Sequence, residues 1–152
     1  MKSLTFGTDT ARDKYEEFLQ EYSEYKEDET SIKKAKNLSI SAWHLVDWVF
    51  EDYKTSHNFD KIGDFRETLY PTCQSLKIMH DLANASKHMN LNRPKANLKN
   101  TEKHIGPFTR QFTSQFDKTY LKIELYDSTE LRFEDEIDKV KVFWDNYLKN
   151  KY

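Results

Sequence analysis

The 152-residue sequence predicts a mainly α-helical bundle of four to five helices, with a small β-hairpin ahead of the last helix. The chain has only three glycines and three prolines, too few for the many turns of a sandwich or a barrel. Several long segments also place apolar residues at helical spacing. The length fits a single helical domain over residues 1–152, and the 14% aromatic content is expected to supply much of its core.

The first predicted helix begins after Thr10 and runs to about Glu27. Thr10 and Asp13 have the spacing of a capping box. The apolar stripe that follows has a 4-3-4-3 spacing and consists of Ala11, Tyr15, Phe18, Tyr22 and Tyr25. This stripe is expected to face the core.

A second, longer helix is expected from Thr30 or Ser31, either of which can act as its N-cap, to about Ser56. Apolar residues point in nearly every direction around its centre, so it should run through the middle of the bundle. Three polar residues, His44, Asp47 and Glu51, share one stripe of this segment. Because buried polar groups need partners, His44 and Asp47 are interpreted as a structural pair, a core histidine bonded to a carboxylate.

The remaining elements follow from breaks in these patterns. Asp64 is expected to cap a short helix that Pro71 ends or restarts, and a longer helix should continue through Met89. Residues 90–116 indicate an extended loop with one possible strand. Apolar alternation on both sides of a turn at 127–129 predicts a β-hairpin at about 118–134. From Asp135 the apolar period is helical again and predicts the closing helix.

Cys73 is the only cysteine, which excludes an intramolecular disulfide and a cysteine-rich zinc site. A buried thiol is the expected state of this residue. The N-terminus lacks the apolar run of a signal peptide, and no stretch of about 18 apolar residues exists. These features predict a cytoplasmic protein without a membrane partner.

Charge is unevenly distributed along the chain, although the net value is only -2. Residues 1–30 carry four basic and nine acidic residues, whereas residues 85–118 carry seven basic and two acidic ones. A solvated surface is the commoner cause of such clustering, and a nucleic-acid contact is the functional alternative. The candidate phosphate-binding residues are Arg93, Lys95, Lys99 and Lys103.

One face of the helix that precedes this basic segment is polar. On a helical wheel an arc of about 120° contains His80, Asp81, Asn84, Lys87 and His88. The other side should anchor the helix and consists of Ile78, Leu82, Ala85 and Met89. A solvent-facing surface is the ordinary explanation of such an arc. Histidines beside a lysine and a carboxylate also provide the groups that general acid or base catalysis requires.

The stretch Ala83-Asn84-Ala85-Ser86-Lys87-His88 resembles the R-N-x-x-x-H motif of HEPN-domain proteins. That superfamily consists of small helical bundles, often dimeric, many of which are metal-independent RNases. The resemblance implies that Asn84 is the polar motif residue and His88 the motif histidine, while Ala83 occupies the position of the motif arginine. A broader pattern, Ala42 to Trp48 followed by Asp81 to His88, also resembles a group of uncharacterised bacterial and prophage proteins.

The first functional hypothesis is therefore a HEPN-like protein that engages RNA, either as a metal-independent RNase or as a catalytically degenerate relative. His88, Lys87 and Asn84 are the candidate catalytic residues, and His80 and Asp81 join the basic segment as candidate substrate-binding residues. In cleavage a ribose 2'-OH would attack the phosphate, with His88 moving the proton and Lys87 stabilising charge.

The alternative is a non-enzymatic, prophage or defence-associated protein that uses the same polar arc to contact a protein partner. Small residues at 83, 85 and 86 favour a homodimer in either case. A metal site built from His44, His80 and His88 with Asp47 or Asp81 is a third interpretation of these residues. The chain lacks the histidine spacings typical of metal sites, so no metal and no other cofactor is expected.

Overall fold

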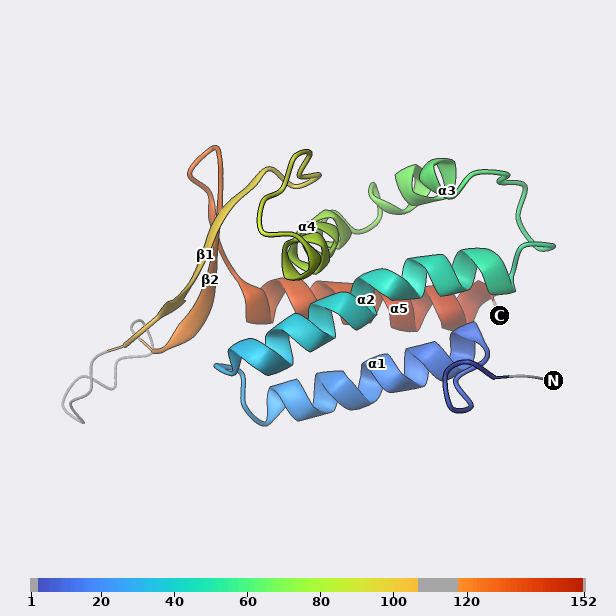
Figure 1. Cartoon of the computed structure of the whole chain (residues 1–152), viewed down its shortest axis with the longest axis horizontal. Helices are drawn as coiled ribbons and strands as arrows, with labels where there is room; N and C mark the ends of the chain where they lie inside the picture. The colour runs from blue at the N-terminus through green and yellow to red at the C-terminus, as the bar shows by residue number, and fades with distance from the viewer. Residues whose placement is uncertain (1–2, 107–117, 152) are drawn as a thin grey trace.

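The computed structural model describes residues 3–106 and 118–151. Its helices are α1 (Ala11–Lys26), α2 (Ile32–Asp52), α3 (Ile62–Leu69), α4 (Ser75–Lys87) and α5 (Phe133–Lys151). Its strands are β1 (Leu98–His104), β2 (Tyr120–Leu125) and β3 (Glu130–Arg132). The predicted fold class, a helical bundle with a small β element before the last helix, is confirmed (Figure 1).

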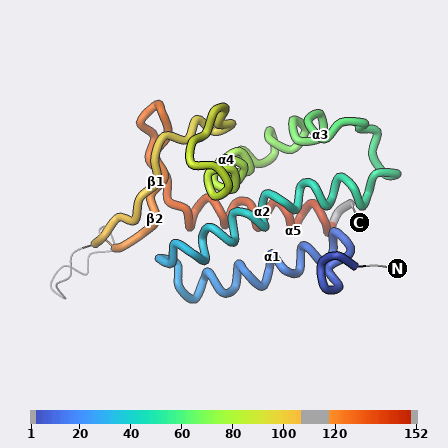
Figure 2. The backbone as a smooth tube through the Cα atoms, in the orientation of Figure 1, coloured from blue at the N-terminus to red at the C-terminus, as the bar shows by residue number. Residues whose placement is uncertain are grey.

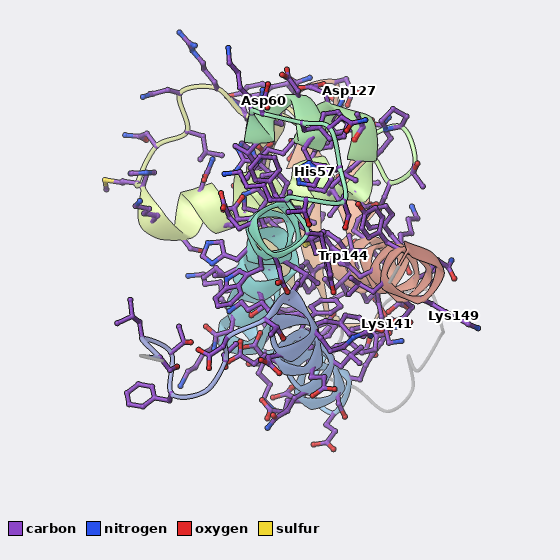
Figure 3. All side chains as sticks on the ribbon, turned by 90° about the vertical axis from the view of Figure 1, so that its right-hand side faces the viewer. His57, Asp60, Asp127, Lys141, Trp144 and Lys149 are labelled. Carbon is purple, nitrogen blue, oxygen red and sulfur yellow. The ribbon has the colours of Figure 1, made fainter. Side chains whose placement is uncertain are left out.

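Three long helices, α1, α2 and α5, run side by side, whereas α4 crosses them and is seen nearly end-on in Figure 1. The sheet lies at one end of this bundle, and β3 leads directly into α5. Viewed along the long helices, α2 is central, and the fully buried Trp144 of α5 lies beside it (Figure 3). The indole nitrogen of Trp144 donates to the Ala42 carbonyl at 3.2 Å, so the central helix contacts α5 through both apolar packing and a buried hydrogen bond.

The starts of α1 and α2 agree with the caps expected from sequence. The Thr10 hydroxyl accepts from the Asp13 amide at 3.1 Å, and the Asp13 carboxylate accepts from the Thr10 amide at 3.0 Å. The predicted capping box of α1 is therefore confirmed. At α2 the cap is Ser31, whose hydroxyl accepts from the Lys34 amide at 3.2 Å.

Helix α2 ends at Asp52, a turn before the expected end near Ser56. The imidazole of His57 bonds the Phe50 carbonyl at 2.9 Å, and this carbonyl is the group that a longer helix would pair with the amide of residue 54. The carboxylate of Asp52 also accepts from the Ala11 amide at 2.7 Å. The returning loop therefore satisfies a backbone carbonyl at the end of α2, and the Asp52 side chain satisfies a backbone amide at the start of α1.

Three other boundaries differ from those expected. Lys61, rather than Asp64, is the N-cap of α3, and Asp64 lies in the first turn, where its charge favours the positive end of the helix. Helix α4 ends at Lys87 because His88 has an extended backbone. Phe133, expected in the hairpin, begins α5.

The sheet is antiparallel with the order β1-β2-β3. The predicted hairpin is confirmed as β2 and β3, which pair Ile123 with Leu131. The single strand expected within residues 90–116 is β1. It pairs with the edge of β2 that β3 leaves open, and Thr101 lies opposite Ile123. Residues 107–116 of the expected loop lie outside the described residues.

The segment between α4 and β1 is held against α4 by a buried carboxylate. Asp81 is 0% exposed, and its two oxygens accept from the backbone amides of Lys95 and Ala96 at 2.7 and 2.8 Å. Figure 2 shows the chain doubling back over α4 before it enters β1. Because an ionised acceptor makes strong bonds to amides, Asp81 determines the path of this segment.

Helices α1 and α5 are joined by two tyrosine–aspartate hydrogen bonds. The Tyr15 hydroxyl donates to Asp145, and the Tyr22 hydroxyl donates to Asp138 at 2.6 Å. Partial burial, the hydrogen bond and the aspartate charge raise the pKa of each tyrosine to about 12. The folded state therefore keeps these two phenols protonated at pH values where an unfolded chain loses their protons.

The tyrosine–aspartate hydrogen bonds predict that the free energy of unfolding falls at alkaline pH. Because the pKa in the folded state is raised, their contribution to stability is fully present below about pH 10 and declines as the pH rises toward about 12. Urea unfolding of the Tyr15→Phe/Tyr22→Phe protein between pH 8 and 11 should show a shallower loss of stability with pH than the parent. Replacement of the exposed Tyr126 by Phe is the control, and equal slopes for all three proteins would contradict the assignment.

Replacing Asp81 tests the buried tether. Asp81→Ala leaves two backbone amides without their acceptor and should lower the free energy of unfolding by about 2–4 kcal/mol. Replacement of the exposed Asp60 by Ala should stay within about 0.5 kcal/mol of the parent. Hydrogen exchange provides the local readout, since the amides of Lys95 and Ala96 should lose protection in Asp81→Ala. Unchanged protection there would show that the tether is not what orders the segment.

Candidate functional site

The polar arc predicted on α4 divides into a buried part and an exposed part. Asp81 is fully buried, His80 and Asn84 are half-buried, and Lys87 and His88 at the end of the helix are exposed. The division arises because the segment after α4 folds back over Asp81 but leaves the last turn open. Only the end of the arc is therefore fully accessible to a large ligand.

His80 is held on both sides of its ring. Its Nδ1–H donates to Asp81 at 2.8 Å, and its Nε2 accepts from the Asn84 amide at 3.1 Å. These two bonds fit a ring that carries a hydrogen on Nδ1 and accepts at Nε2. The edge of the ring also contacts Trp43, with 4.9 Å between ring centroids. His80 is thus oriented by three neighbours.

These contacts change the roles expected for two residues. Asp81 was expected to bind substrate, but its zero exposure and its bonds to the backbone give it a structural position. Asn84, the polar residue of the HEPN-like motif, uses its amide to hold His80. Sequence reasoning placed these residues on one face correctly, but helical spacing cannot show that a later segment covers part of that face.

The interpretation of His44 and Asp47 as a buried structural pair is wrong. His44 is exposed, and the Asp47 carboxylate bonds Arg66 of α3 at 2.8 Å. Glu51, on the same stripe, is exposed as well. The stripe is the outer surface of α2, because α3 contributes a cation to it rather than an apolar cover.

His44 nonetheless lies close enough to α4 for the charge of Lys87, in the last turn of that helix, to affect its pKa. Although the side chain is exposed, partial desolvation of its ring lowers the pKa of His44. Asp47 opposes this shift, and the positive charges of Lys14 and Lys87 add to it. The imidazole is therefore held in its neutral form near pH 7, the form that accepts a proton. His44 of α2 and Lys87 of α4 thus belong to one surface.

Arg66 was not singled out from the sequence. Its guanidinium lies over the Trp43 ring at 5.0 Å, while Tyr70 stacks on the same ring with a centroid distance of 6.5 Å. Arg66 comes from α3, far from the motif in sequence, and no spacing pattern connects the two. Ala83, which occupies the position of the motif arginine, is buried and has no polar side chain.

Most of the predicted basic segment is accessible. Arg93, Lys95 and Lys103 are exposed, and within residues 3–106 and 118–151 no carboxylate lies within ion-pair distance of them. Lys99 differs, because it pairs with Glu124 at 3.4 Å. The bonds to Asp81 hold the backbone of Lys95 and Ala96 against the middle of α4, and Lys95 lines the same cavity as Ser75 and Ile78 of that helix.

The other candidate chemistries find little support in the described part of the chain. Its histidine, cysteine, aspartate and glutamate side chains form no group of three or more that is placed to hold a metal ion. Cys73 is buried as expected, and burial raises the pKa of its thiol, which makes it a poor nucleophile.

The side of α4 expected to anchor it is only partly buried. Ile78 is buried and Leu82 half-buried, but Ala85 is exposed and Met89, beyond the helix, is 100% exposed. Of the small residues expected to contact a second copy, Ala83 is used inside the chain and only Ala85 and Ser86 reach the surface. The homodimer stays a prediction.

Among the described helices, none has the length and apolar character needed to cross a membrane. Comparison of the chain with known proteins found no matching family model, no matching curated protein and no matching solved structure. The functional assignment therefore depends on the chemistry of the surface around the end of α4.

Proposed function

We propose that this protein binds RNA through the exposed end of α4 and the segment that follows it. The observation that carries the proposal is that Lys87 of α4 and Arg93 and Lys95 of the following segment are exposed cations with no carboxylate at ion-pair distance among the described residues. Cations of this kind favour a phosphate backbone. The buried Asp81 orders the segment in advance, which lowers the entropy lost on binding. We call this group, with His88 and His44, the α4-end surface.

The α4-end surface also contains the groups needed for metal-independent cleavage. A neutral His44 or the exposed His88 accepts the proton of a ribose 2'-OH as that oxygen attacks the adjacent phosphate. The P–O5' bond then breaks to leave a 2',3'-cyclic phosphate, and the departing 5'-oxygen takes a proton from the other histidine or from water. Lys87 stabilises the negative charge that develops on the phosphate. The HEPN-like motif, with His88 as its histidine, supports the same surface. We place this activity in the cytoplasm, where the single cysteine stays reduced.

Charge removal tests RNA binding. The Lys87→Ala/Arg93→Ala/Lys95→Ala protein should bind single-stranded RNA at least tenfold more weakly, and the slope of log K against log salt should fall by about 2. The matched control replaces three exposed lysines elsewhere, Lys33, Lys61 and Lys149, with Ala. It therefore has the same net charge as the triple variant. Fluorescence anisotropy at several salt concentrations measures both quantities.

RNA binding by the parent protein distinguishes an RNA-binding protein from a protein-interaction module. If it binds no RNA at low salt, or if the control variant loses as much affinity as the triple variant, the α4-end surface is not an RNA site. A protein partner then becomes the better explanation of the exposed polar residues. Incubation of the parent with total RNA, with and without a chelator, separates binding from cleavage and shows whether a metal is needed.

The histidines predict a pH signature. Because Lys87 lowers the pKa of His44, replacing Lys87 with Ala should raise that pKa toward its ordinary value of about 6.5. Titration of the His44 ring by NMR measures the shift without any assay of activity. If the protein cleaves RNA through His44, the acid limb of its rate profile should move upward by the same amount.

Removal of His88 completes this test. His88→Ala should abolish cleavage or weaken RNA binding while costing less than about 1 kcal/mol of stability, as expected for an exposed side chain. Urea melts provide the stability measurement. A large fall in the unfolding midpoint with unchanged activity per folded molecule would show that His88 is structural.

A further inference from the structure

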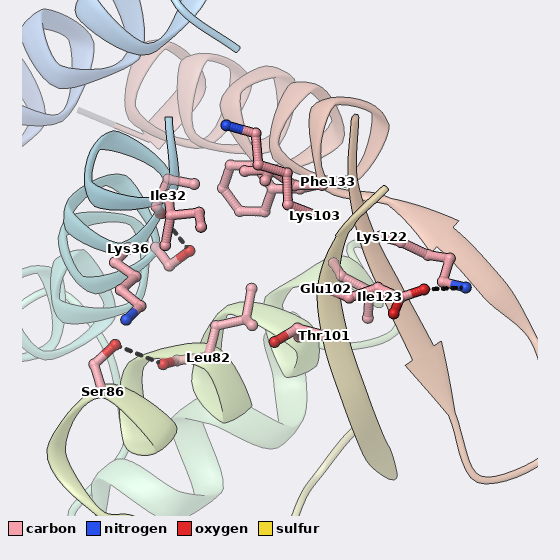
Figure 4. Close-up of a pocket in the computed structure, with 13 residues that line it drawn as sticks. Ile32, Lys36, Leu82, Ser86, Thr101, Glu102, Lys103, Lys122, Ile123 and Phe133 are labelled. Atoms are coloured by element: carbon pink, nitrogen blue, oxygen red, sulfur yellow. Dashed lines mark hydrogen bonds and ion pairs between the residues drawn. The ribbon is translucent and has the colours of Figure 1, made fainter. Parts of the chain in front are cut away.

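A cavity of about 250 Å³ lies on a different side of α4 from the α4-end surface, between α2, α4 and the sheet (Figure 4). Its inner wall is apolar and comes from three elements, with Ala35 of α2, Ile123 of β2 and Phe133 at the start of α5 all buried. Leu82 of α4 and Leu121 of β2 are half-buried and complete the wall. Apolar surface that is open to a cavity favours an apolar occupant.

Two lysines stand at the rim of this cavity. Lys36 comes from α2 and Lys103 from β1, and both are exposed (Figure 4). Within the described ranges, neither has a carboxylate at ion-pair distance. A third lysine, Lys122, bonds Glu102 at 2.6 Å and lies 3.6 Å from Glu130, so its charge is compensated. The cavity therefore combines an apolar interior with two uncompensated positive charges at its opening.

We propose that this cavity binds a single-chain amphiphilic anion, with its hydrocarbon tail against the apolar wall and its carboxylate or phosphate head between Lys36 and Lys103. The tail gains free energy by leaving water, and the head gains charge-assisted hydrogen bonds. At about 30 Å³ for a water-sized group, the cavity holds roughly eight such groups, which sets a short tail. The proposal is independent of RNA binding.

The lining disfavours a nucleotide as the occupant. A base needs donors and acceptors for its edges or aromatic faces for stacking. The lining contains one aromatic ring, Phe133, which is buried, and its carboxylate, Glu102, is already bonded to Lys122. The hydroxyl of Ser86 donates to the Leu82 carbonyl of its own helix. An alkyl tail satisfies this wall without requiring any polar partner.

A chain-length series tests the proposal directly. The parent protein is titrated with butanoate, hexanoate, octanoate and decanoate, and backbone amide NMR shifts report binding. Each added CH₂ should tighten binding about fourfold until the tail fills the cavity, beyond which the gain should stop. The shifts should centre on Leu82, Ile123 and Phe133. Octanol should bind more weakly than octanoate, and octyltrimethylammonium should not bind.

Two kinds of variant separate the head from the tail. Lys36→Gln/Lys103→Gln should weaken octanoate binding about tenfold and leave octanol binding unchanged. Lys33→Gln/Lys61→Gln removes the same charge outside the cavity and should match the parent. Thr101→Trp places a ring from the exposed face of β1 into the cavity and should abolish binding of both ligands. Amide shift dispersion and urea melts confirm that each variant is folded.

Several results would overturn the proposal. Equal affinity for octanoate and octanol would remove the role of the lysines, and affinity independent of chain length would remove the role of the cavity. Unaltered octanoate binding by the folded Thr101→Trp protein would place the ligand elsewhere. Adenosine monophosphate that bound at the same amides more tightly than octanoate would make the cavity a nucleotide site.

Discussion

The buried carboxylate of Asp81 is the interaction on which the accessible features of this molecule depend. An ionised side chain with no exposure is costly unless its lone pairs are used, and here two backbone amides and one imidazole use them. The bonds return residues 95 and 96 to α4 and thereby direct the chain into β1. Without this return, the basic segment would have no defined position relative to the end of α4.

The same tether separates α4 into two different environments. On one side it fixes the backbone of the segment that carries Arg93 and Lys95. Near the end of the helix, partial desolvation and the charge of Lys87 both lower the pKa of His44. On another side β1 approaches α2 and α4 and encloses the apolar cavity. The proposed RNA-binding surface and the apolar cavity are therefore neighbours on different sides of one short helix.

The helical framework behind these features is stabilised at both faces of α2. Trp144 bonds the Ala42 carbonyl within the core, whereas Arg66 covers Trp43 and bonds Asp47 at the outer side. Tyr15 and Tyr22 join α1 to α5 through aspartates rather than through apolar contact alone. A chain with few aliphatic residues thus relies on aromatic rings that also make polar contacts.

The sequence by itself determined the elements whose signals are local. The capping box at Thr10, a cap at Thr30 or Ser31, the hairpin turn and the apolar stripe of the closing helix depend on residues within a few positions of one another. It also placed His80, Asn84 and Lys87 on one face of α4, whereas His88 lies just beyond the helix with an extended backbone. The tertiary structure alone decided that Asp81 is buried, that His44 is exposed and that Arg66 pairs with Asp47. These outcomes depend on which distant segment covers each face, and helical periodicity contains no information about that partner.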